Sequence, residues 1–148
     1  MTKCFVLDID GVLLKTEPIF REICDLQLKG DERWDYFHKY CNSDKVLPIQ
    51  GVLEFWYRIA YGNEIVLCTA RNEKCKEATL AKLQYHGFIV PDENIYMRTD
   101  GDYREATEVK KELLQKIMSK YEVIAFIDDT LSNCEVAKEL GILSMRMI

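Results

Sequence analysis

The chain has 148 residues, of which 48% are hydrophobic and 30% are charged, and its formal net charge is −5. A domain of this length buries roughly 70% of the surface of its unfolded chain, so one sizeable core is expected. The acidic balance excludes a global basic field, so we expect no extended binding to a nucleic-acid duplex, although a local pocket for one phosphate remains open. No segment approaches the ~20 apolar residues of a membrane span, and the six cysteines form no C-x-x-C pair, so we expect a reduced, cytoplasmic protein without membrane contact.

Three short apolar runs predict the main strands, at residues 4–7, 64–69 and 123–128. Each run is apolar at consecutive positions, which is typical of strands buried on both faces of a parallel sheet. Weaker runs at 95–97 and 143–145 predict two further strands.

Helical periodicity fills the gaps between these runs and predicts helices at 51–61, 72–86, 104–121 and 132–140. Three of these four segments are followed directly by glycine, a common helix stop. The alternation of strands and helices predicts a doubly wound, Rossmann-like α/β domain with a parallel sheet that spans residues 1–148.

Residues 14–48, which directly follow the first strand, fit this alternation less well. They contain a predicted helix at 17–28 and then an acidic and aromatic segment at 30–38. We expect these residues to form a small cap-like insertion.

Polar side chains follow the three main strands. The first run ends in Asp8 and Asp10, the second in Thr69 and Arg71, and the third in Asp128-Asp129. Ligands of parallel sheets bind at the carboxyl ends of the strands, so these groups are expected at one edge. Asp8 and Asp10 share one side of an extended backbone, and two such charges persist when a cation or a proton relieves their repulsion.

Four carboxylates with few histidine or cysteine ligands nearby favour a hard, oxygen-ligated ion, Mg²⁺ over Zn²⁺. The chemistry that this set suits is phosphoryl transfer. One aspartate can attack phosphorus while its neighbour serves as acid and then base. A threonine hydroxyl can donate to a phosphoryl oxygen, and a lysine can neutralise the transferring group.

Four motifs resemble those of the haloacid dehalogenase-like (HAD) phosphatase superfamily, in the right order across nearly the whole chain. They are residues 8–13, residues 66–69, Lys110 and residues 127–129. Lys110 is preferred over Lys111 because it follows Val109.

The resemblance implies a role for each matching residue. Asp8 would be the nucleophile that forms an aspartyl-phosphate, and Asp10 the general acid and base. Thr69 and Lys110 would bind the phosphoryl group. The ligands of Mg²⁺ would be Asp8, the backbone carbonyl of Asp10, and Asp128, with assistance from Asp129.

A closer resemblance concerns residues 69–71, 97–104 and 108–112, which look like the phosphatase domain of bacteriophage polynucleotide kinase-phosphatases. That family removes 3′-phosphates from nucleic-acid ends and nucleotides. The resemblance implies such a substrate here, bound by Arg71, Arg98 and Arg104, and the host cytoplasm as the location if the chain is phage-encoded.

The chain also departs from the phage pattern. Ala106 and Thr107 stand where the phage enzymes have acidic residues ahead of the motif lysine, and the arginine expected after the first motif is matched only by Lys15 and Arg21, in imperfect register. No G-x-x-x-x-G-K-[ST] loop occurs, so a kinase half is not expected within these residues.

Other functions remain open. Within the phosphatase class, the alternatives are a 5′-nucleotidase or a small-metabolite phosphatase. Outside it, the alternative is an inactive domain that binds a phosphorylated ligand, although the expected nucleophile and acid are both intact. An EF-hand loop needs a glutamate at its twelfth position between helices, and a receiver domain carries its phosphate on an aspartate in mid-chain, so neither fits.

Single residues also have structural interpretations. Thr69 and the pair Asp128-Asp129 could be helix caps, and Lys110 could lie on a solvated helix face. The aromatic residues of the insertion could stack on a base or simply pack the insertion onto the domain: Trp34, Tyr36 and Phe37. We expect His38 and His86 to have structural and not catalytic roles.

Overall fold

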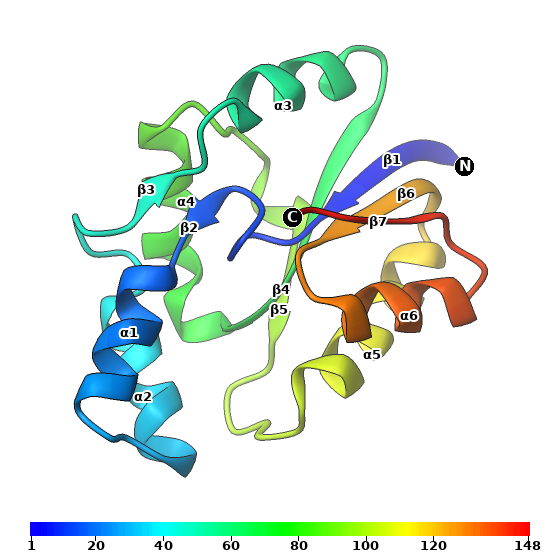
Figure 1. The fold of residues 1–148 in the computed structure, drawn as a ribbon. Helices are drawn as coiled ribbons and strands as arrows, with labels where there is room; N and C mark the ends of the chain where they lie inside the picture. The colour runs from blue at the N-terminus through cyan, green and yellow to red at the C-terminus, as the bar shows by residue number, and fades with distance from the viewer.

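The main sheet of the protein has five parallel strands in the order β5-β4-β1-β6-β7, as seen in a computed structural model that describes residues 1–148 (Figure 1). The strands are Thr2–Leu7 (β1), Glu64–Asn72 (β4), Ile95–Arg98 (β5), Tyr121–Asp128 (β6) and Ser144–Arg146 (β7). Val6 pairs with Val66 on one side and with Phe126 on the other, so β1 lies at the centre. All five predicted strands are confirmed, with ends that differ by a few residues.

Helices cover both faces of this sheet, which confirms the doubly wound α/β fold. They are Val52–Ala60 (α3), Lys76–Tyr85 (α4), Ala106–Met118 (α5) and Leu131–Glu139 (α6), with 3-10 turns at Glu73–Cys75 (η1) and Asp92–Asn94 (η2). Successive residues of β1 point to opposite faces. Leu7 joins the core that includes Trp56 of α3 and Leu83 of α4, whereas Val6 joins a second core with Val109 of α5.

Residues 14–48 contain four further elements: Leu14–Lys15 (β2), Glu17–Asp25 (α1), Gly30–Tyr40 (α2) and Leu47–Pro48 (β3). The two short strands pair in antiparallel fashion, and the two helices lie beside each other at the lower left of Figure 1. The predicted helix at 17–28 ends earlier, at Asp25.

The acidic and aromatic segment at 30–38 is helical, which the sequence pattern did not predict. Phe37 is the one buried residue of α2, and it belongs to the same core as Ile19 and Ile23 of α1. Such a weakly apolar helix depends on tertiary packing for its stability.

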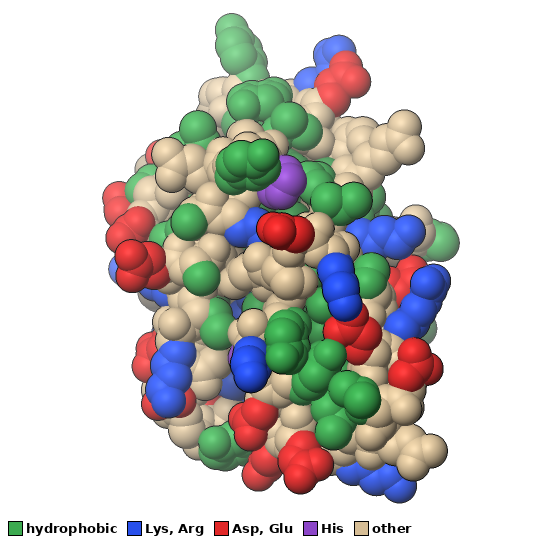
Figure 2. Space-filling model, turned by 90° about the vertical axis from the view of Figure 1, so that its left-hand side faces the viewer, with side chains coloured by type: hydrophobic (Ala, Val, Ile, Leu, Met, Phe, Trp, Pro, Cys, Tyr) green, Lys and Arg blue, Asp and Glu red, His purple; other side chains and the backbone are tan.

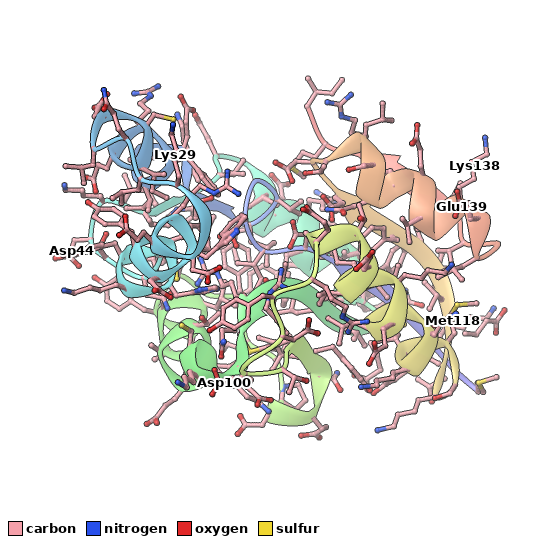
Figure 3. The ribbon with its side chains drawn as sticks, turned by 90° about the horizontal axis from the view of Figure 1, so that it is seen from below. Lys29, Asp44, Asp100, Met118, Lys138 and Glu139 are labelled. Atoms are coloured by element: carbon pink, nitrogen blue, oxygen red, sulfur yellow. The ribbon has the colours of Figure 1, made fainter.

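The carboxyl ends of β1, β4, β5 and β6 meet at one edge of the sheet. In Figure 3, which views the molecule from below, Lys29 and Asp44 of the insertion lie on one side, and Met118, Lys138 and Glu139 of the α5–α6 layer lie on the other. None of the helices combines the length and the apolar character that crossing a bilayer requires.

Candidate active site

A pocket of about 1290 Å³ opens at the carboxyl edge of the sheet. Asp8 and Asp10 line it, together with residues of the insertion and of the segment 98–106 that leads into α5. The C-terminal residues Met147 and Ile148 also border the pocket, because the Met147 N–H donates to the carbonyl of Asp128 at 2.9 Å and so draws the chain end toward β6.

Lys110 of α5 connects two of the predicted acids. Its Nζ lies 2.6 Å from Oδ2 of Asp128 and 3.0 Å from Oδ2 of Asp8. All three side chains are buried. Asp128 is held further by the backbone N–H of Thr130 at 2.9 Å and by Nδ2 of Asn133 at 3.2 Å. The acid at the end of β6 is therefore fixed from three directions.

Burial raises the pKa of Asp8 to about 8, since the Lys110 charge offsets the loss of hydration only in part and Asp128 adds repulsion. Burial alone would lower the pKa of Lys110, but the charges of Asp8 and Asp128 outweigh it and hold this pKa above its ordinary value. The site therefore holds more negative charge than one ammonium group neutralises.

The donor set suits a divalent cation. Carboxylate oxygens of Asp8, Asp128 and Asp129 all lie within 4.8 Å of one another, and burial next to Asp128 raises the pKa of Asp129. The buried Oδ1 of Asn133 has no hydrogen-bond partner. Clustered oxygen donors with unrelieved negative charge are what a hard ion such as Mg²⁺ binds.

Gly11 permits this cluster to form beside the first motif. Its φ of +81° lies in the left-handed region, and a Cβ built on it would stand 2.0 Å from Oδ2 of Asp129. A side chain at this position would displace Asp129 from the other two acids.

Asp10 has a different partner from Asp8. Its carboxylate accepts from Nη2 of Arg71 at 2.7 Å and from Nε of the same arginine at 3.1 Å. Its side chain is 19% exposed, against 0% for that of Arg71. Asp8 thus belongs to the carboxylate cluster that could hold a cation, whereas Asp10 forms an ion pair with Arg71. Both acids line the pocket.

Arg71 uses every N–H of its guanidinium group within the protein. Nη1 donates to Oδ1 of Asn42 at 2.6 Å and to Oγ1 of Thr79 at 3.1 Å, and Nη2 also donates to the carbonyl of Cys41 at 3.3 Å. With Nε and the second Nη2 hydrogen on Asp10, all five donors are occupied. This arrangement fits a residue that positions Asp10 and ties the insertion to β4, whereas the sequence indicated a substrate contact.

Of the other residues predicted to bind the substrate or its phosphoryl group, Arg98 and Arg104 border the pocket, whereas Thr69 does not. Thr69 is fully buried and its Oγ1 accepts from the backbone N–H of Arg71 at 3.1 Å. Arg98 borders the pocket and donates to three backbone carbonyls, that of Ala70 at 2.9 Å among them. Burial lowers the pKa of Arg98. Arg104 also borders the pocket, but it is paired with Asp102 and with Glu112 of α5.

The structure separates the two residues that matched the phage arginine imperfectly. Lys15 borders the pocket, whereas Arg21 lies outside it and pairs with Glu17 on the exposed side of α1.

Sequence reasoning missed Asn42, Thr79 and Asn133 as site residues. Asn133 lies in the first turn of the helix after Asp128-Asp129, and that position is a signal that could have identified it. No sequence signal marks Asn42, which lies 29 residues from its partner Arg71. His38 borders the pocket, and its Nε2 accepts from the backbone N–H of Asn72 at 3.1 Å.

The parallel sheet with a carboxylate cluster at its edge is the arrangement of HAD-like phosphatases. The sequence model of the polynucleotide kinase PNKP phosphatase domain matches residues 2–147. The chain belongs to this family and is therefore a phosphatase. No curated protein matches the chain.

Solved structures share the fold. A chain of the Pnkp1/Rnl/Hen1 RNA repair complex has 22% identity and a TM-score of 0.77 over 99% of this chain and 42% of its own length. Class C acid phosphatase from Bacillus anthracis, with tungstate bound, has 19% identity and a TM-score of 0.68 over 89% of this chain and 53% of its own. The haloacid dehalogenase-like protein SP0104 from Streptococcus pneumoniae has 13% identity and a TM-score of 0.66 over 100% and 85%. The chain thus spans less than half of the repair-complex chain that it matches.

Proposed function

We propose that the chain is a Mg²⁺-dependent phosphomonoesterase that acts through an aspartyl-phosphate on Asp8. The observation that carries this proposal is the division of partners between the two acids of the first motif. Asp8 lies with Lys110 and Asp128 in the cation cluster, whereas Asp10 lies outside it and pairs with Arg71. A nucleophile and a proton carrier need such different surroundings.

In the proposed reaction, an oxygen of Asp8 attacks phosphorus and the bond to the leaving alkoxide breaks. Asp10 gives its proton to that alkoxide and then takes a proton from the water that hydrolyses the aspartyl-phosphate. Lys110, 3.0 Å from Asp8, stabilises the charge on the transferring group. Bound Mg²⁺, held by Asp8, Asp128, Asp129 and the backbone carbonyl of Asp10, would supply further charge stabilisation.

The proposed substrate is a 3′-phosphate on a nucleotide or a nucleic-acid end. Support comes from the polynucleotide kinase phosphatase family and from the likeness to a chain of an RNA repair complex. The pocket of about 1290 Å³ is large enough for more than a phosphate group. We further propose that residues 1–148 act as one catalytic domain, with residues 14–48 as its cap, in a reducing cytoplasm that keeps the six cysteines free.

The test compares the wild type with Asp8→Asn and Asp10→Asn in Mg²⁺, on p-nitrophenyl phosphate, 3′-dTMP, 5′-dTMP and a 3′-phosphorylated oligonucleotide. We expect turnover of the 3′-substrates by the wild type and none by Asp8→Asn. The matched control is Asp92→Asn, an exposed acid remote from the pocket, which should retain wild-type rates. Activity that survives in Asp8→Asn would refute the nucleophile assignment.

The intermediate has its own measurement. Acid-quenched wild-type protein should carry phosphate from the substrate that neutral hydroxylamine releases, as an acyl phosphate does, and Asp8→Asn should carry none. A preference for 5′-dTMP over both 3′-substrates would instead favour the 5′-nucleotidase alternative. Binding of 3′-dTMP without any hydrolysis would favour an inactive phospho-ligand domain.

A further inference from the structure

The pocket continues beyond the catalytic acids onto the insertion. Phe20 of α1, Trp34 of α2 and Leu47 of β3 all border the pocket that Asp8 and Asp10 border. A phosphoryl group at Asp8 would fill only part of a cavity of about 1290 Å³, since pockets for whole drug-sized ligands are roughly 300–1,000 Å³.

Two large aromatic rings of the insertion border the pocket and are partly exposed. Phe20 is 38% exposed and Trp34 is 37% exposed. Both rings contact Phe37, with ring centroids 5.0 Å apart and nearly parallel for Phe20, and 6.2 Å apart and nearly perpendicular for Trp34. Phe37 itself is 4% exposed. The buried ring of Phe37 thus packs against the partly exposed rings of Phe20 and Trp34 and fixes their orientations.

Cationic side chains line the same pocket as these rings. The guanidinium carbon of Arg33 lies 4.6 Å from the ring centroid of Trp34, and Lys15 borders the same pocket. Figure 2, which views the molecule from the side of the insertion, shows hydrophobic groups among charged side chains of both signs. Aromatic rings interleaved with cations are the surface on which single-stranded nucleic acid binds, through base stacking and phosphate contacts.

We propose that Phe20 and Trp34 form a subsite for the nucleobase of the nucleotide whose phosphate lies at Asp8. The inference rests on the proposed function. The base packs against the exposed ring surfaces, and Arg33 and Lys15, which border the same pocket, would contact the adjoining phosphodiester. Stacking tolerates any base, because every base has a π-face. The subsite therefore selects nucleotides over smaller phosphate esters without selecting a sequence.

The test varies the base and the rings together. Two 3′-phosphorylated oligonucleotides are compared, one ending in thymidine and the other in an abasic residue. Trp34→Ala and Phe20→Ala should each lower kcat/KM for the thymidine substrate about 5- to 150-fold, mainly through a higher KM. The same variants should hydrolyse the abasic substrate at the wild-type rate, so that substrate also reports whether the insertion still folds.

Two variants serve as controls. Trp34→Phe keeps an aromatic ring and should restore most of the lost kcat/KM. Tyr85→Ala removes an 85% exposed ring that does not border the pocket, and it should match the wild type on both substrates. Equal losses on both substrates for Trp34→Ala and Phe20→Ala would overturn the proposal and assign these rings to packing of the insertion.

Binding can be measured apart from turnover. The chain has two tryptophans, and Trp56 is 3% exposed and packed against Phe88, so a ligand in the pocket reaches only Trp34. In the Asp8→Asn background with Mg²⁺, 3′-dTMP should change the tryptophan emission, and inorganic phosphate should not. The change should vanish in Asp8→Asn combined with Trp34→Phe.

The outcomes separate this inference from the proposed function. If the wild type hydrolyses the thymidine and abasic substrates equally well, the subsite is refuted and the 3′-phosphatase activity stands. If the wild type hydrolyses p-nitrophenyl phosphate but neither oligonucleotide, the proposed substrate class is refuted, and the subsite with it.

Discussion

Replacement of Arg71 by lysine separates a positioning role from a substrate-binding role. The guanidinium group donates to Asp10, Asn42, Thr79 and the carbonyl of Cys41 with all five of its N–H groups. An ammonium group has three donors, so at least two of these bonds are lost in a fully buried site.

The magnitude follows from these lost bonds. A hydrogen bond to a charged group contributes about 1.5–3 kcal/mol, so we expect the loss of two such bonds in Arg71→Lys to lower the free energy of unfolding by about 3–6 kcal/mol. In a domain of this size that corresponds to a fall in Tm of about 6–24 °C. General acid–base catalysis contributes about 10²–10⁴-fold to a rate, and a displaced Asp10 should reduce kcat about 10²-fold.

The assay is steady-state hydrolysis of 3′-dTMP together with thermal unfolding. A positioning role predicts a lower kcat with KM nearly unchanged, because in that role Arg71 borders the pocket but uses its donors within the protein and makes no bond to the substrate. The control is Arg58→Lys, which alters an arginine on the exposed side of α3 that pairs only with Glu54. A normal Tm with a KM raised tenfold or more and an intact kcat would refute this reasoning and restore Arg71 to substrate binding.

Three further predictions concern the cation cluster and its surroundings. Gly11→Ala should lower the free energy of unfolding by about 1–3 kcal/mol, because φ at this position is +81° and the new Cβ would collide with Asp129. The variant should also need a higher Mg²⁺ concentration for half-maximal activity. If its Mg²⁺ titration matched that of the wild type, the proposed cation cluster would be contradicted. Asp128→Asn should lose activity that higher Mg²⁺ partly restores, and no rescue at any concentration would count against a ligand role. Burial and the nearby charges of arginines lower the pKa of His38, so the folded state resists protonation and stability should fall as the pH drops below the ordinary value of about 6.5. His38→Gln keeps an acceptor for the Asn72 N–H and should flatten that fall in Tm between pH 7 and pH 5; an unchanged pH profile would assign it to other groups.

The sequence was sufficient to predict the strands, and it placed the candidate acids at the strand ends, because both are local signals. Consecutive apolar residues at 123–127 are typical of a strand buried on both faces, and such a strand places Asp128 at its carboxyl end. The same reasoning predicted Asp8 at the end of the first strand. Lys110 came instead from the resemblance to the phosphatase motifs, and the structure brings it within 3.0 Å of Asp8.

The rest depends on contacts between distant segments. The helix at Gly30–Tyr40 has only Phe37 buried, so periodicity alone gives too little signal to predict it. The environment of Arg71 is set by Asn42 and Thr79, which lie in the insertion and in α4. A sequence pattern shows that an arginine lies near the carboxyl end of β4, but it does not show whether the N–H donors of that arginine are free for a substrate.

The position of the chain end has a practical consequence for handling the protein. The Met147 N–H and the Arg146 side chain bond to the carbonyls of Asp128 and Asp129 at 2.9 and 3.1 Å, and Figure 1 places the C-terminus beside the carboxyl end of β1, with the N-terminus at the far end of that strand. A purification tag fused after Ile148 would therefore emerge at the rim of the pocket and compete with substrate for access. A tag ahead of Met1 would leave from the opposite edge of the sheet and keep the entrance clear, while a small fluorophore attached at the C-terminal end would be well placed to report ligand entry.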